Sequence, residues 1–427
     1  MVLKIKGIGK IQDSQIEMKG ITVIAGENNT GKSTFGKVLY CMFNAFHNTK
    51  AAIRNERIND IRRIFDNTAL FEFDSSIHKR LSIMLVDELR NKTIEKLSID
   101  NIREIMMNTV FEYSNPQNLE ANSDIDNIAV FIKRSLTVSD IDIQKIVITH
   151  YFENEFERRI NHVNKPDSAG SVSLVIKGRN VDVTIRRNEC DEFIDNVGIR
   201  HNAIYIDNPF VLDDIQLRNK EYSSSNFYRK YGSNINHRRN LINRLEKEHS
   251  ENTVIEEVII NQKITGILSN INKITNGEFI EKKEDLMFIE SGLKKPVPLF
   301  NVSAGLKTFL IIKRLLELGE IKERNILILD EPEIHLHPAW QLQFAEILVL
   351  LQKEFNLTIL LTTHSPYFLN AIEVYSEAYE IKEQTNFYLA KSNGDTSDVR
   401  EVTGTIDTIY KQLAMPFQEL EDISYGD

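Results

Sequence analysis

The stretch that decides the fold is GENNTGKST, residues 26–34. Its glycines, lysine and serine have the spacing of a phosphate-binding loop. The apolar run ITVIA precedes the loop and is typical of a short buried strand, and the pattern of residues 32–46 predicts a helix directly after it. In this context the N–H groups of the loop and of the first helical turn would cradle the phosphates of a nucleotide. An accidental glycine-rich turn is the weaker interpretation.

The residues of this loop have separate expected roles. Lys32 is expected to reach the β- and γ-phosphates, and the Ser33 hydroxyl is expected to bind Mg²⁺. The predicted nucleotide-binding residues are Gly26, Glu27, Asn28, Asn29, Thr30, Gly31, Lys32, Ser33 and Thr34.

A second stretch, NILILDEPEIHLHP at 325–338, is an aliphatic run that ends in two carboxylates. A phosphate-loop protein needs a second strand whose terminal aspartate orients Mg²⁺, and Asp330 ends such a strand. Glu331 is predicted to polarise the attacking water as a general base. Paired acids at a strand end can also form a solvated turn, and Pro332 could open the next helix. The phosphate loop upstream favours the catalytic interpretation.

The same stretch leaves a different metal site open. Glu333, His335 and His337 alternate along an extended segment, so their side chains share a face and could ligate a metal. No further cluster at metal-binding spacing accompanies them. We favour the alternative that these side chains anchor the turn.

Two further segments carry candidate site residues. NVSAGLKTFLIIKRLLEL (301–318) places Ser303 and Gly305 before an amphipathic helix, where they could bind another subunit's γ-phosphate or simply cap the helix. LTTHSPYF (361–368) places His364 at the end of the next predicted parallel strand. That position lies on the sheet edge where ligands collect, so His364 is predicted to sense the γ-phosphate rather than to be structural.

Composition excludes some classes of protein. The chain has 427 residues, of which 41% are hydrophobic and 27% charged, a balance typical of soluble globular proteins. We expect neither a membrane span nor a signal peptide, and two cysteines fit a reducing cytoplasm. Most of the net charge of −10 comes from the last 55 residues, so overall acidity does not exclude nucleic acid as a partner of the main body.

The apolar patterns predict a divided architecture. From residue 304 onward helices and strands alternate, which predicts a parallel sheet covered on both faces. We expect an α/β P-loop NTPase head split between 1–45 and 295–427. Residues 46–294 are expected to form a large, mainly helical insert, whose strands at 171–207 could also belong to the head.

In order, GENNTGKS, SAG, ILILDEPEIHLHP and TTHSP resemble the motifs of ABC-type ATPases of the SMC and RecF kind. Over 1–45 and 295–385 the chain is similar to the bacterial OLD-like AAA-family ATPases of phage-defence and abortive-infection systems. The resemblance implies ATP and Mg²⁺ as cofactors, with Walker A, signature, Walker B and switch histidine in these four segments. It also implies a head-to-head dimer in which the signature motif contacts the ATP of the other subunit.

The sequence departs from this pattern at two points. SAGLK, residues 303–307, lacks the second glycine and the glutamine of the common SGGQ signature, which puts the contact from Leu306 in question. A Q-loop glutamine has no evident counterpart. OLD nucleases continue into a TOPRIM domain, which we do not expect in the 63 residues after His364.

Two functions remain open. The leading one is a cytoplasmic, dimeric ATPase switch or sensor of an anti-phage system that controls a separate effector protein. The alternative is a RecF- or SMC-like DNA-binding ATPase in repair or maintenance. Residues 227–245 carry five bases and no acid, so they could contact DNA or dock an acidic partner. The long insert and DEPEIHLHP disfavour a transporter subunit, and intact Lys32, Asp330 and Glu331 disfavour a purely structural protein.

Overall fold

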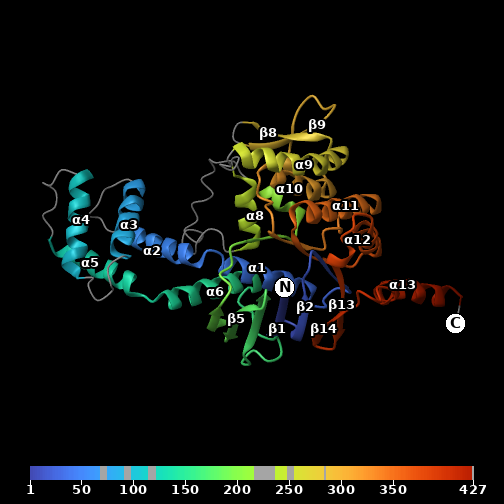
Figure 1. The fold of residues 1–427 in the computed structure, drawn as a ribbon, viewed down its shortest axis with the longest axis horizontal. Helices are drawn as coiled ribbons and strands as arrows, with labels where there is room; N and C mark the ends of the chain where they lie inside the picture. Colours follow the sequence, from blue (N-terminus) through green and yellow to red (C-terminus); the bar gives the residue numbers. More distant parts are fainter. Residues whose placement is uncertain are drawn as a thin grey trace. The chain divides into compact units, whose positions relative to one another are not determined.

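The computed structural model describes residues 1–67, 75–90, 98–113, 122–215, 236–247, 254–282 and 285–425 (Figure 1). The chain divides into two compact units. One, called the head, comprises Met1–Phe46 and Ile148–Asp427, and the other, called the lobe, comprises His47–Val147. All four motif segments lie in the head, so the fold of the head positions the predicted site.

The head contains an eleven-stranded sheet with the order β6-β5-β4-β1-β2-β14-β13-β3-β12-β11-β7. Strands β13, β3, β12, β11 and β7 are parallel to one another, whereas β6, β5, β4, β1 and β2 form an antiparallel half. The strands are β1 (Val2–Ile8), β2 (Ile11–Glu17), β3 (Ile21–Gly26), β4 (Gly170–Ile176), β5 (Arg179–Arg186), β6 (Glu189–Asp195), β7 (Ala203–Ile206), β11 (Ile326–Asp330), β12 (Thr358–Thr363), β13 (Thr385–Asn393) and β14 (Thr396–Glu401).

Helices cover both faces of the parallel half, which explains its continuous apolar strands. Successive side chains of a strand point to opposite faces, so Ile21 and Val23 of β3 enter one core and Ile24 enters the other. The first core includes residues of α8 (His237–Leu245), α9 (Val254–Thr275), α10 (Ala304–Glu317), α11 (Pro338–Phe355) and α12 (Pro366–Ala378). Figure 1 shows α9 to α12 grouped together. The second core includes α1 (Lys32–Ala45) and the end of α6 (Asp140–Phe156).

The order of the parallel strands brings the motifs to one edge. β12 pairs with β3 on one side and with β11 on the other, in parallel. The phosphate loop after β3, the acids after β11 and His364 after β12 therefore follow the carboxyl ends of three adjacent strands. The predicted α/β fold, with the phosphate loop after a parallel strand and a helical insert, is confirmed.

The residues expected as one insert, 46–294, divide between the two units. β4 pairs with β1 antiparallel, from Val2 opposite Val175 to Lys6 opposite Ser171, so the strands at 171–207 complete the sheet of the head. Helices α8 and α9 pack on that sheet as well, because their apolar faces lie in its first core. The separate unit is therefore limited to His47–Val147.

The lobe is helical over the residues that the structure describes. It contains α2 (Thr49–Asp66), α3 (Ser75–Arg90), α4 (Ile99–Tyr113), α5 (Asn122–Thr137) and the start of α6. Its core gathers apolar side chains from four helices, among them Ile61, Leu85, Ile102 and Ile128. This core is separate from the two cores of the head.

The remaining elements of the head complete the pattern predicted from the sequence. Residues 277–298 contain a three-stranded sheet of β8 (Gly277–Lys282), β9 (Asp285–Glu290) and β10 (Val297–Pro298). The C-terminal segment forms a single helix, α13 (Asp407–Tyr425). Within the described part of the chain, no helix has the length and apolar character needed to cross a membrane.

Candidate functional site

The phosphate loop leaves β3 at Gly26 and enters α1 at Lys32. Gly26 has φ 152°, and a Cβ atom there would lie 2.3 Å from the carbonyl oxygen of Ala390 on the neighbouring strand β13. Gly31 precedes the helix in the left-handed conformation, with φ 78°. Both positions therefore require glycine, because a side chain would collide with β13 at the first and strain the backbone at the second.

The ammonium group of Lys32 lies across the loop. Its Nζ donates to the carbonyl oxygens of Gly26 (2.8 Å) and Glu27 (2.7 Å) and lies 3.2 Å from Oε1 of Glu331. The Lys32 side chain is only 4% exposed, so its charge is held in one place by these three groups. This geometry joins the phosphate loop directly to the predicted general base.

The rest of the loop presents backbone and polar groups to solvent. Glu27, Asn28 and Asn29 are exposed, whereas Thr30 is buried and its hydroxyl donates to the carbonyl of Glu27 at 2.8 Å. Ser33 and Thr34 are half-buried in the first turn of α1. A residue that the motif does not include, Lys10, donates to Oδ1 of Asn29 at 2.6 Å. A second cation thus stands at the predicted phosphate site.

Both oxygens of the Asp330 carboxylate accept hydrogen bonds. The Thr362 hydroxyl on β12 donates to Oδ1 at 2.5 Å, and the Tyr205 hydroxyl on β7 donates to Oδ2 at 3.2 Å. Burial raises the pKa of Tyr205 well above its usual range, so this hydroxyl retains its proton. Neither Tyr205 nor Thr362 is among the site residues predicted from the sequence. The run AIYID, which ends in an acid like the β11 strand, was the available signal for the first of them.

Glu331 occupies a strained turn between β11 and the residues that follow. Its backbone is left-handed (φ 48°), and its N–H donates to the hydroxyl (3.0 Å) and carbonyl (3.2 Å) oxygens of Thr362. Oε2 lies 3.5 Å from Nδ1 of His364. The nearby His364 ring and the charge of Lys32 lower the pKa of Glu331, and the nearby Glu331 carboxylate raises the pKa of His364. Glu331 is therefore anionic at neutral pH, as a general base must be.

Glu333 anchors the turn and holds the segment that carries His364. It is 2% exposed, and its Oε1 accepts from the Thr363 hydroxyl (2.5 Å) and from the His364 N–H (3.1 Å). Its burial raises the pKa of its carboxyl group. The structure thus agrees with the anchoring role and not with a metal role.

The two histidines of the alternative metal site point elsewhere. His337 caps α11 by accepting from Ala339 N–H at 3.3 Å, and the His335 ring packs edge-on against Phe210 at 5.3 Å. Within the described residues, no group of three or more histidine, cysteine or acidic side chains could hold a metal ion by itself. The side chains of Glu333, His335 and His337 therefore do not converge on one point in this structure.

The predicted signature segment begins α10. The Ser303 side chain accepts a hydrogen bond from the Leu306 N–H at 3.4 Å, so Ser303 is the N-cap of α10. Ser303 is exposed to solvent. A Cβ on Gly305 would lie 2.8 Å from the carbonyl oxygen of His335 and 3.2 Å from the Trp340 ring. Gly305 therefore permits close packing of α10 on the turn after β11. Binding of a second subunit's nucleotide by Ser303 and Gly305 stays a prediction.

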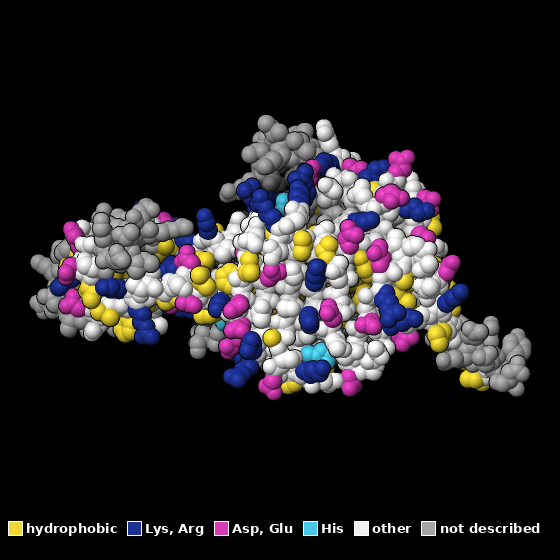
Figure 2. All heavy atoms as spheres, turned by 60° about the horizontal axis from the view of Figure 1, so that its bottom comes forward, with side chains coloured by type: hydrophobic (Ala, Val, Ile, Leu, Met, Phe, Trp, Pro, Cys, Tyr) yellow, Lys and Arg dark blue, Asp and Glu magenta, His cyan; other side chains and the backbone are white. Residues whose placement is uncertain are grey.

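The basic segment 227–245 is described from residue 236 onward, so Phe227, Tyr228, Arg229, Lys230 and Tyr231 lie outside the described residues. Arg244 does not line a channel, because it is buried and its Nη1 lies 2.6 Å from Oε2 of Glu320. Arg238 is exposed but pairs with Asp214 at 2.7 Å. Figure 2 shows basic and acidic side chains intermingled on the visible face.

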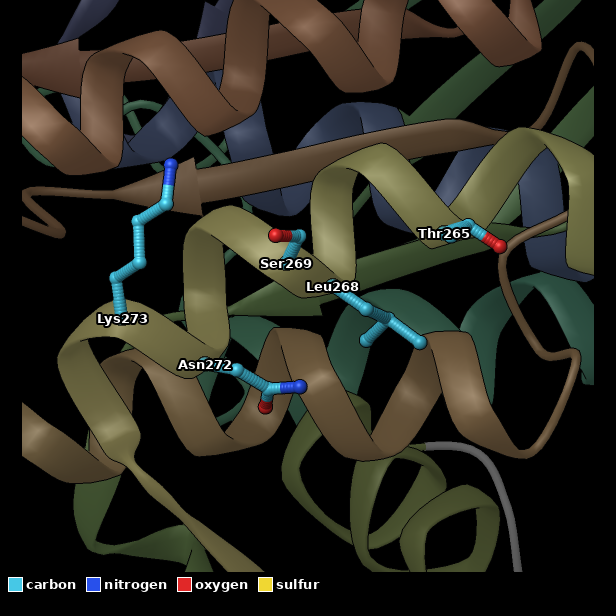
Figure 3. Close-up of a pocket in the computed structure, with 5 residues that line it drawn as sticks. All are labelled: Thr265, Leu268, Ser269, Asn272 and Lys273. Carbon is cyan, nitrogen blue, oxygen red and sulfur yellow. The ribbon is translucent and has the colours of Figure 1, made fainter.

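A shallow hollow lies on α9, lined by Thr265, Leu268, Ser269, Asn272 and Lys273 (Figure 3). Its lining includes none of the predicted site residues. Lys32, Glu331 and His364, which the sequence predicts as site residues, meet instead at the carboxyl ends of β3, β11 and β12.

Comparison with known proteins identifies a family for this chain. A model of the AAA ATPase domain family matches residues 1–369. The chain is 29% identical over 136 residues to the "Retron Vc95 probable ATPase" of Vibrio cholerae serotype O1 biovar El Tor. That match covers 29% of this chain and 25% of the relative, so the chain spans about a quarter of the relative's length.

Two solved SMC head domains match the chain at low sequence identity. The SMC head domain from Thermotoga maritima is 12% identical, with a TM-score of 0.39, over 94% of this chain and 98% of that domain. An SMC head bound to the C-winged helix domain of ScpA is 11% identical, with a TM-score of 0.43, over 94% and 96% of the two chains. Because the family model spans most of the chain, including the loop from Gly26 to Thr34, this protein belongs to the AAA ATPase domain family.

Proposed function

We propose that this protein hydrolyses ATP at the edge where Lys32, Glu331 and His364 meet. The supporting observation is that Glu331 contacts both the phosphate-loop lysine, at 3.2 Å, and the histidine of the next strand, at 3.5 Å. Lys32 neutralises the β- and γ-phosphates, and Glu331 takes the proton of the attacking water. His364 bonds to the γ-phosphate and orients Glu331.

Mg²⁺ is the expected metal of this reaction. The Ser33 hydroxyl and the Asp330 carboxylate would hold it, because both are hard oxygen donors of the kind that Mg²⁺ prefers. The site fits this role, since both carboxylate oxygens of Asp330 are already oriented by donors from β7 and β12. When bound, the ion would supply positive charge that neutralises the negative charge developing on the phosphates.

The ATPase acts, in our proposal, as a dimeric switch. The exposed N-cap Ser303 and Gly305, which lies two residues later, are at the N-terminus of α10. This helix N-terminus can receive the γ-phosphate of a second copy. ATP would then close two heads and hydrolysis would release them. Glu331→Gln should accumulate as an ATP-dependent dimer in light scattering, and adding Ser303→Glu should return it to monomer without loss of ATP binding. An unchanged mass with and without ATP would contradict the switch.

We propose that the switch controls a separate effector in bacterial anti-phage defence. Two observations support this role: the resemblance of the motifs to OLD-like defence ATPases, and the partial match to a protein named as a retron's probable ATPase. Residues 238 and 239, both exposed arginines on α8, are candidates for docking that effector. Co-purification with the products of neighbouring genes would identify it.

The described residues support the DNA-binding alternative less than the basic run 227–245 does in the sequence. Of the three arginines of 227–245 that the structure describes, Arg244 is buried and Arg238 is paired with an acid. Reversal of Arg238 and Arg239 to glutamate separates the two functions. We expect loss of the effector in a pull-down and unchanged turnover, whereas reversal of the exposed Arg186 and Arg187 should change neither. Tight, salt-sensitive duplex binding that this first reversal abolishes would favour a DNA clamp.

A further inference from the structure

Tyr205 connects the metal-binding carboxylate to the interior of the head. It lies on β7, opposite Ile328 of β11 in a parallel pair, and it is 1% exposed. Its hydroxyl is 3.2 Å from Oδ2 of Asp330. With the Thr362 hydroxyl on Oδ1, this bond leaves the carboxylate a single orientation. A group that orients a ligand in this way tunes the affinity of the metal site.

The Tyr205 ring is in turn held by the first residue of α8. The His237 ring centroid lies 4.5 Å from that of Tyr205. His237 is itself held on two sides, because its Nδ1 is 2.6 Å from Oε2 of Glu155 on α6 and its Nε2 is 3.0 Å from Oδ2 of Asp207 after β7. The His237 N–H also donates to the other Glu155 oxygen, at 2.8 Å.

We propose that Tyr205 is a positioning residue for Asp330, and that His237 fixes Tyr205 so that the docking of α8 sets the metal affinity of the site. This inference rests on the proposed function, because it assigns these residues a part in binding the metal of ATP hydrolysis. It goes beyond that function in making α8 a point of control. Whatever displaces the start of α8 frees the Tyr205 ring and lets the Asp330 carboxylate turn.

The carboxylates of Glu155 and Asp207 hold His237, and with it the start of α8, in place. Glu155 has a fully buried side chain, so losing the histidine would leave its charge without the two bonds that now satisfy it. The start of α8 therefore stays docked unless a partner supplies comparable interactions. A tyrosine that only filled the core would need neither the hydrogen bond to Asp330 nor the packing of the His237 ring against its own ring.

The test measures metal binding separately from turnover. In a Glu331→Gln background, which keeps ATP intact, Mn²⁺ is titrated into protein saturated with ATP, and free Mn²⁺ is followed by its electron paramagnetic resonance signal. Tyr205→Phe keeps the ring and removes the hydroxyl, and we expect it to weaken Mn²⁺ binding about tenfold. His237→Gln should weaken it in the same direction by a smaller factor.

The matched control is Tyr388→Phe. Tyr388 is also buried in the head sheet, but its hydroxyl bonds to the backbone of Glu17 and not to Asp330. It should bind Mn²⁺ as the parent does. In the active protein, Tyr205→Phe should raise the Mg²⁺ concentration for half-maximal turnover and keep the maximal rate at saturating Mg²⁺.

Equal Mn²⁺ affinity of Tyr205→Phe and its parent would overturn the inference while leaving the proposed function in place. An equal loss in Tyr388→Phe would also overturn it, because the effect would then be a general loosening of the sheet. If the parent itself bound no Mn²⁺ in the presence of ATP, the proposed function would fail and the inference with it.

Discussion

Replacing His237 by glutamine should remove a pH-dependent part of the protein's stability. Burial alone would lower the pKa of His237, but the bonds to Asp207 and Glu155 outweigh it and raise the pKa from 6.5 to about 9. A group with a raised pKa stabilises the fold fully below its unfolded pKa of 6.5 and loses that effect as pH rises through 9. The rise of the His237 pKa from 6.5 to about 9 corresponds to about 3 kcal/mol of unfolding free energy.

The linkage relation gives the course of this loss. The stabilisation by His237 should be about 3 kcal/mol at pH 6, roughly half of that at pH 8 and close to zero at pH 10. The difference in unfolding free energy between the wild type and His237→Gln should shrink over the same window. Other titratable groups facing His237, namely Tyr40 and Tyr205, have pKa values raised above 10, and they remain neutral across most of it.

Two assays check this prediction. Denaturant titrations of both proteins at pH 6, 8 and 10 give the difference in free energy directly. Nuclear magnetic resonance of ¹³C-labelled histidines follows all ten rings, and the resonance missing from His237→Gln identifies this one. Titration of that resonance at or below pH 6.5, or a free-energy difference that does not change with pH, would refute the reasoning about the Glu155–His237–Asp207 cluster.

The remaining predictions concern the loop and the core. Lys32→Ala should weaken ATP binding and abolish turnover in a folded protein, because the phosphates lose the compensating charge; unchanged affinity in titration calorimetry would contradict the assignment. Gly26→Ala should lower stability by roughly 1–3 kcal/mol, since its Cβ would meet the Ala390 carbonyl at 2.3 Å, and thermal denaturation should show the loss. Arg244→Ala should cost about 3 kcal/mol in denaturant unfolding, because the buried Glu320 carboxylate would keep only Lys247 at 2.7 Å. The exposed Arg239→Ala should change stability by under about 0.5 kcal/mol.

Local motifs allowed the centre of the fold to be predicted, because their spacing reflects local geometry. The loop from Gly26 to Ser33 needs a strand before it and a helix after it, and both can be recognised from the apolar pattern alone. The apolar runs ending at Asp330 and before His364 likewise predicted adjacent parallel strands. These elements depend on neighbours in sequence.

What the sequence did not reveal depends on partners far apart in the chain. Tyr205 and Asp330 are 125 positions apart, and the hydrogen bond between them arises only when β7 pairs with β11. The sequence left open whether the strands at 171–207 belong to the head for the same reason, since the pairing of β4 with β1 joins residues about 170 positions apart. Arg244 belongs to the basic run 227–245, but in the folded chain its side chain is buried. Its partner there is Glu320, which is 76 positions away in the sequence.

The central claim is that Glu331 is the general base of an ATPase centred on the phosphate loop. The most direct measurement compares phosphate release and ATP binding in the wild type and Glu331→Gln, with Mg²⁺ present. We predict that the wild type hydrolyses ATP and that the variant binds ATP with similar affinity but releases phosphate at least about a hundredfold more slowly. Equal rates of phosphate release in the two proteins, or no ATP binding by the wild type, would contradict the account.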